Sequence, residues 1–76
     1  MGWKTYLVMY FGTNGVKITD IVKKVEVLGF KAALGPIDFE YSWKVAPKRE
    51  EVFKLGDKLT EVLNGTGVIF NLDTHD

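Results

Sequence analysis

The sequence predicts an α+β fold in which strands and helices follow the order βαββαβ and the strands form an antiparallel sheet. Apolar residues alternate with polar ones near the start, in the middle and near the end of the 76-residue chain, as they do in strands. Between these segments, two longer ones carry apolar residues at helical spacing, and glycine-containing turns separate most neighbours. Because a chain of this length has room for one hydrophobic core, residues 1–76 are expected to form one domain.

The first strand is predicted over residues 3–11 (WKTYLVMYF), which are rich in β-branched and aromatic side chains and end at a GTNG turn. Alternation directs one set of side chains to the core: Trp3, Thr5, Leu7, Met9 and Phe11. The other set faces outward: Lys4, Tyr6, Val8 and Tyr10. From Val16 the spacing becomes helical, and Gly29 is typical of a helix end. The inward stripe of this helix consists of Ile18, Ile21, Val22, Val25 and Leu28.

Two strands are predicted next, over residues 30–34 and 37–45, with Gly35 and Pro36 as the turn between them. The second of these segments (IDFEYSWKV) alternates more clearly than any other in the chain. Its core face is expected to hold Ile37, Phe39, Tyr41, Trp43 and Val45. Its solvent face is expected to hold Asp38, Glu40, Ser42 and Lys44.

The second helix is predicted from Pro47, which suits a first turn, to about Leu63. Its inward residues are Val52, Leu55, Leu59, Val62 and Leu63. Gly56 lies on that stripe, where it weakens the helix by about 1 kcal/mol relative to Ala, and a close approach to the sheet would explain it. The last strand is predicted over residues 68–72, with Val68, Phe70 and Leu72 inward, and His75 and Asp76 are expected to form a tail.

Each predicted helix has one apolar stripe, so both must cover the same face of the sheet. Right-handed crossovers then leave the strand order 4-1-3-2 as the simplest closure, with residues 30–34 and 68–72 as the outer strands. This element order resembles the ferredoxin-like superfold over nearly the whole chain. The resemblance implies the fold and says little about function.

The composition excludes several kinds of chemistry. Ten basic and ten acidic residues give a net charge of zero, so no global field attracts nucleic acid or an anionic membrane, and Arg49 is the single arginine. The absence of cysteine excludes disulfides, thiolate nucleophiles and cysteine-based metal sites, and His75 is the only histidine. We therefore predict no catalytic, cofactor-binding or metal-binding residue.

Two general properties of the protein are also expected from its residues. No apolar run is long enough for a membrane span and no signal peptide is recognisable, so a cytoplasmic location is expected. The charged residues are mostly lysine and glutamate and glutamine is absent, which is compatible with a thermophilic source.

The aromatic residues Phe39, Tyr41 and Trp43 lie on the strand where RNA-recognition motifs, which share this fold, carry their stacking residues. The alternation nevertheless places all three under the helices. The open face then offers the carboxylates of Asp38 and Glu40 where a phosphate backbone would pass. We therefore expect these aromatics to be core residues and expect no nucleic-acid partner.

A glycine-containing loop ends the first strand and opens the first helix. Its residues Gly12, Thr13, Asn14 and Gly15, with Lys17 nearby, could hold a small anion, although a tight turn alone would also explain the glycines. The string FGTNGVKITDIVKKVEVLGF is loosely similar to ACT domains, and this resemblance implies a small ligand at a dimer interface. Acylphosphatases of the same superfold use this loop with an arginine, which is missing here.

Four side chains are predicted to form a mildly apolar patch on the open sheet face: Tyr6, Val8, Tyr10 and Ile69. Such patches mark interfaces more often than catalytic sites. The sequence thus favours a non-enzymatic binding or assembly module that acts through this face or an edge strand, with a second copy or another protein as partner. An ACT-like regulatory domain that binds a small ligand is the alternative, and a nucleic-acid binder or a small phosphate-handling enzyme is a third hypothesis.

Overall fold

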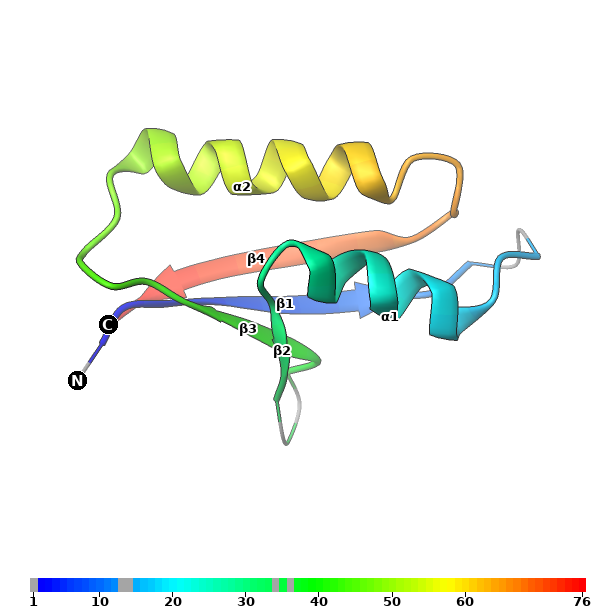
Figure 1. Cartoon of the computed structure of the whole chain (residues 1–76), viewed down its shortest axis with the longest axis horizontal. Coiled ribbons are helices and arrows are strands. Elements are labelled where there is room, and N and C mark those ends of the chain that lie inside the picture. Colours follow the sequence, from blue (N-terminus) through cyan, green and yellow to red (C-terminus); the bar gives the residue numbers. More distant parts are fainter. Residues whose placement is uncertain (1, 13–14, 34, 36) are drawn as a thin grey trace.

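The computed structural model describes residues 2–12, 15–33, 35 and 37–76. Along the chain the elements are β1 (Lys4–Tyr10), α1 (Ile18–Val27), β2 (Lys31–Ala32), β3 (Phe39–Ser42), α2 (Arg49–Val62) and β4 (Ile69–His75). The four strands form one antiparallel sheet in the order β2-β3-β1-β4, which is the predicted order 4-1-3-2 read from its other edge. Both helices cover one face of this sheet (Figure 1). The predicted ferredoxin-like plait is confirmed.

The strand β1 lies in the centre of the sheet. It pairs with β3 from Lys4 opposite Ser42 to Leu7 opposite Phe39. It pairs with β4 over its full length, from Lys4 opposite His75 to Tyr10 opposite Ile69. The start of β1 at Lys4 therefore lies beside the end of β4 at His75 (Figure 1).

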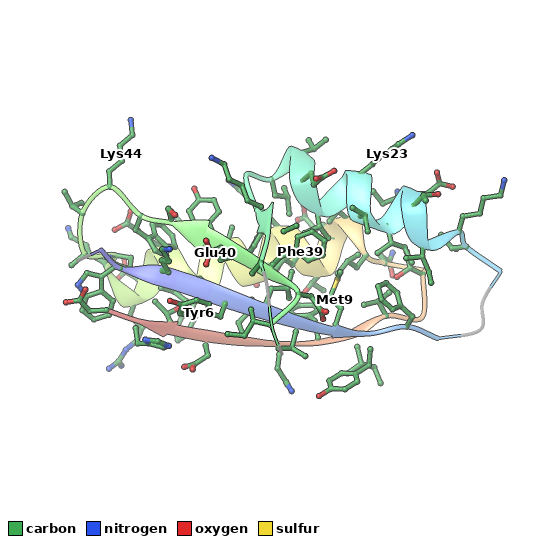
Figure 2. All side chains as sticks on the ribbon, turned by 90° about the horizontal axis from the view of Figure 1, so that it is seen from below. Tyr6, Met9, Lys23, Phe39, Glu40 and Lys44 are labelled. Atoms are coloured by element: carbon green, nitrogen blue, oxygen red, sulfur yellow. The ribbon has the colours of Figure 1, made fainter. Side chains whose placement is uncertain are left out.

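The hydrophobic core lies between the sheet and the two helices. Its buried residues are Leu7, Met9, Ile21, Val25, Phe30, Phe39, Leu55, Leu59 and Leu63. Figure 2 shows Met9 and Phe39 directed into the space between the strands and the helices. Tyr41 in β3 and Trp43 just after it are partly buried and pack against this core, so the predicted orientation of Phe39, Tyr41 and Trp43 is confirmed. The last strand contributes as predicted, through Val68, Phe70 and Leu72.

A short chain of hydrogen bonds runs through the buried end of the sheet. The Thr5 hydroxyl accepts a hydrogen bond of 2.8 Å from the Trp43 indole Nε1. It lies 2.7 Å from the Thr74 hydroxyl, and because Trp43 already donates to it, its own hydrogen is available for Thr74. Thr5 is fully buried, so these two partners offset the cost of removing its hydroxyl from water.

The strand β3 is shorter than residues 37–45, for which a strand was predicted. At its start, the Asp38 backbone N–H donates to the Leu7 carbonyl at 3.1 Å, and the Asp38 carboxylate accepts the Met9 N–H at 2.8 Å. The carboxylate thereby takes the place of a backbone partner for Met9. At its other end, the Trp43 N–H still donates to the Trp3 carbonyl at 3.0 Å, but Val45, two residues further on, is 76% exposed, so its predicted core position is wrong.

The helices also begin later than predicted. The helix α1 starts at Ile18 instead of Val16, and Ile18 itself is exposed, so it does not belong to the inward stripe. The helix α2 starts at Arg49, after Pro47, and the Glu51 carboxylate accepts the Lys48 N–H at 2.9 Å at that end. This side-chain acceptor satisfies a backbone donor near the start of the helix.

The outer strands differ from their predicted lengths in opposite directions. The strand β2 is reduced to Lys31–Ala32, while Phe30, just before it, is a core residue. The strand β4 continues to His75, because β1 supplies paired positions as far as Lys4. The expectation that His75 belongs to a frayed tail is therefore wrong.

Candidate functional site

The sheet face away from the helices brings the predicted patch together. The Cα atoms of Tyr10 and Ile69 are paired across β1 and β4, and Val8 lies two residues from Tyr10 on the same face. The Tyr10 side chain is 58% exposed and that of Ile69 is 69% exposed. The patch is thus an apolar area at one end of the open face.

The other end of the open face carries charges of both signs. The Lys4 ammonium lies 3.3 Å from a Glu40 carboxylate oxygen across β1 and β3. The Tyr6 ring is stacked on His75, with centroids 4.7 Å apart and an interplanar angle of 30°. His75 Nε2 in turn lies 3.7 Å from an Asp73 carboxylate oxygen. Tyr6 is therefore partly covered, and it links the apolar patch to this polar end.

The contact between Tyr6 and His75 is not among the contacts predicted from the sequence. It follows from the length of β4, which continues for three residues beyond the predicted strand end at Leu72. The length of the first predicted strand could have indicated it, since a long central strand can pair with an equally long neighbour.

The outer edge of β4 is the second feature of this region. The Trp3 carbonyl accepts the Trp43 N–H at 3.0 Å, so odd-numbered residues of β1 direct their backbone groups toward β3. Even-numbered residues of β1 then bond to β4, where their partners are odd-numbered. The N–H and C=O groups of Phe70, Leu72 and Thr74 consequently point away from β1. Over the described part of the chain, β1 is the only strand that pairs with β4.

This edge lacks two of the features that commonly prevent strand pairing, a proline and a charge on the helix side. The β4 segment is seven residues long (IFNLDTH) and contains no proline. Its helix-side residues Phe70, Leu72 and Thr74 carry no charge. An uncovered edge of this kind can accept another strand.

The helix α2 extends the apolar surface beside the edge. A Cβ atom at Gly56 would lie 3.6 Å from the Leu72 side chain, so this side of α2 faces β4. Phe53, three residues earlier and hence on the same side of the helix, is 62% exposed. The β4 edge is thus flanked by Phe53 on the helix side and by Ile69 on the open side, with Tyr10 one strand further in.

The glycine-containing loop has structural reasons for both of its described glycines. A Cβ atom at Gly12 would lie 2.7 Å from the Gly67 carbonyl oxygen, and Gly15 has a positive φ of 79°. Lys17 directly precedes α1, and its side chain makes no capping hydrogen bond. Thr13 and Asn14 lie outside the described residues, so anion binding at Gly12, Thr13, Asn14, Gly15 and Lys17 stays a prediction.

In the described part of the chain, no three histidine, aspartate or glutamate side chains gather as metal ligands would. No helix found there is long and apolar enough to cross a membrane.

No protein-family model matches the chain. No curated protein and no solved structure matches it significantly either. Since many unrelated functions share a ferredoxin-like plait, the function has to be argued from the geometry of this particular surface.

Proposed function

We propose that this protein is a small non-enzymatic assembly module that forms a homodimer by pairing β4 with β4 of a second copy. The observation that carries the proposal is the uncovered edge of β4, which has exposed apolar side chains on both of its sides. Pairing would satisfy the outward backbone groups and cover part of the Phe53 and Ile69 side chains, whereas Tyr10, one strand further in, would stay on the open face. Two copies would then share one continuous sheet.

The geometry of β4 selects one register for this dimer. A two-fold axis requires antiparallel pairing of identical strands, and full overlap of Ile69–His75 places the axis at Leu72. Leu72 then faces its own copy, and Phe70 faces Thr74 of the second copy. The residues whose backbone groups point away from β1, Phe70, Leu72 and Thr74, are all in hydrogen-bonded positions. This gives about six inter-chain backbone hydrogen bonds.

Side-chain chemistry supports this register. On the open face, Asn71 lies opposite Asp73 of the second copy, where an amide N–H can donate to the carboxylate. Two such pairs occur per dimer because of the symmetry. The net charge of zero adds no long-range repulsion between the copies. The side chains of Phe53 and Ile69 beside the edge must add to the buried area, because a stable dimer buries on the order of 1,000 Å² or more in total.

A charge substitution at Asn71 tests the proposal. Asn71→Asp would place two carboxylates opposite each other twice in the dimer, whereas Asn71→Lys would place an ammonium opposite each Asp73. Sedimentation of the unmodified chain should give a dimer; the Asp variant should dissociate about tenfold more readily, and the Lys variant should not. Thermal unfolding of both variants at low concentration serves as the folding control.

A monomer at high micromolar concentration for the unmodified chain would exclude self-association altogether. A dimer that responds equally to both charges would exclude the β4 register. It would favour face-to-face packing of the open sheets through Tyr10 and Ile69, for which Tyr10→Glu and Ile69→Lys are the corresponding variants. The cytoplasmic location, the thermophilic source and the ACT-like alternative stay predictions from the sequence.

A further inference from the structure

A groove lies between α2 and the end of β3, on the flank of α2 opposite to Phe53. It is open to solvent, has a volume of about 270 Å³ and is lined by Tyr41, Trp43, Glu51, Lys54, Leu55 and Lys58. A second hollow of about 320 Å³ shares Tyr41, Trp43 and Glu51 with it. The helix α1 ends over the middle of the sheet, so this end of the sheet is covered by α2 alone (Figure 1). Incomplete helix cover explains why there is a groove here.

The floor of the groove consists of aromatic rings. The Tyr41 and Trp43 ring centroids lie 4.8 Å apart at an interplanar angle of 60°. The Trp43 indole N–H already donates to Thr5, so Trp43 offers ring surface to the groove and no free hydrogen-bond donor. Such a floor favours a flat, apolar or aromatic group, which can stack on one ring and contact the edge of the other.

The wall formed by α2 is cationic on balance, with Lys54 and Lys58 against Glu51. Lys54 and Lys58 are four residues apart, so they lie one above the other on the same side of the helix. The ion pairs of the described residues involve neither of them. The Glu51 carboxylate accepts the Lys48 backbone N–H, which holds it at the helix start. Lys44, beside the second hollow, extends away from the molecule into solvent (Figure 2).

We infer that this groove binds small aromatic carboxylates, with the aromatic ring against Tyr41 and Trp43 and the carboxylate between Lys54 and Lys58. The volume of about 270 Å³ lies just below the usual range for ligand sites, which favours a ligand of one or two rings. The two ammonium groups favour a ligand that carries a negative charge beside its ring. This site does not depend on dimerisation, because α2 separates it from the β4 edge.

Indole-3-acetate is a suitable probe, titrated into the ¹⁵N-labelled full chain while amide and indole resonances are followed by NMR. We expect saturable shifts at the Trp43 indole and at the amides of Lys54 and Lys58, with a Kd of about 1 mM or lower. The amides of Val8 and Tyr10 on the open face should not shift. Two related compounds should each bind at least about fivefold more weakly than indole-3-acetate. Tryptophol has the same ring without the charge, and cyclohexylacetate has the charge without the aromatic ring.

Matched lysine variants test the cationic wall. The double variant Lys54→Ala and Lys58→Ala should bind indole-3-acetate about tenfold more weakly. The control, Lys23→Ala and Lys24→Ala, removes the same charge from exposed positions of α1 and should leave the affinity within about twofold. Equal losses in both pairs, equal binding of tryptophol, or no saturation at about 10 mM probe would each overturn the inference. Sedimentation of the same samples reports on the dimer separately.

Discussion

At the scale of single residues, the buried end of the sheet is specified by polar side chains as well as apolar ones. Thr5 accepts from the Trp43 indole and pairs with Thr74, which ties β3, β1 and β4 together across the sheet. This orients Trp43 so that its ring contacts both the core and the groove. The alternation of β3 predicts the face on which Trp43 lies, but its hydrogen-bond partner depends on the register between strands, which is a tertiary property.

Two glycines provide a matched test at this scale. A methyl group at Gly56 would meet only the Leu72 side chain, at an ordinary contact distance of 3.6 Å, so close approach does not require glycine there. We expect Gly56→Ala to stabilise the protein by up to about 1 kcal/mol through its higher helix propensity. Gly12→Ala should destabilise it by more than about 1 kcal/mol, because its methyl group would lie 2.7 Å from the Gly67 carbonyl oxygen.

Urea unfolding of the two variants beside the unmodified chain measures both changes in the free energy of unfolding. A loss of stability in Gly56→Ala would mean that α2 lies closer to β4 than described. An unchanged Gly12→Ala would mean that the contact between the end of β1 and Gly67 relaxes at no cost.

At the scale of elements, periodicity predicts what each segment is, and the neighbours decide where it ends. Both helices and all four strands follow from apolar spacing, and the pair Tyr10 and Ile69 follows from alternation in the two strands. The end of β4 at His75 depends instead on the partners that β1 provides. Phe53 lies outside the inward stripe predicted for the second helix, and its position beside β4 does not follow from the spacing. The groove could not be predicted, because it results from the short length of α1 beside the longer α2.

Hydrogen exchange along β4 should report the state of its outer edge. The amides of Asn71 and Asp73 bond to β1 and should be protected at all protein concentrations. Those of Phe70, Leu72 and Thr74 point outward and should become protected only where the dimer forms. Amide exchange measured by NMR at low and high protein concentration distinguishes the two sets.

The Asn71→Asp variant, measured at a concentration where sedimentation finds it monomeric, provides the reference for that experiment. If the outward amides exchange rapidly at every concentration while sedimentation reports a dimer, the copies associate through another surface. If they are protected even in the monomeric reference, the backbone directions assigned to β4 are wrong.

At the scale of the whole molecule, charge balance sets the range of partners. Ten positive and ten negative side chains leave little long-range attraction for polyanions, and Glu40 and Asp73 lie on the open sheet face that many nucleic-acid binders of this shape would use. The local cationic wall of Lys54 and Lys58 is small enough for one carboxylate, whereas a nucleic acid strand requires several phosphate contacts in a row.

We therefore expect single-stranded and duplex nucleic acids to bind weakly at physiological salt, with a Kd no lower than about 10⁻⁴ M, because few counterions can be released. Fluorescence anisotropy of a labelled oligothymidine and of a labelled duplex measures this directly, and repetition at several salt concentrations gives the number of phosphate contacts. A shallow salt dependence together with weak binding agrees with the charge argument. Submicromolar affinity that falls steeply with salt would contradict the charge argument. The Lys54→Ala and Lys58→Ala double variant would then show whether the groove beside α2 supplies the phosphate contacts.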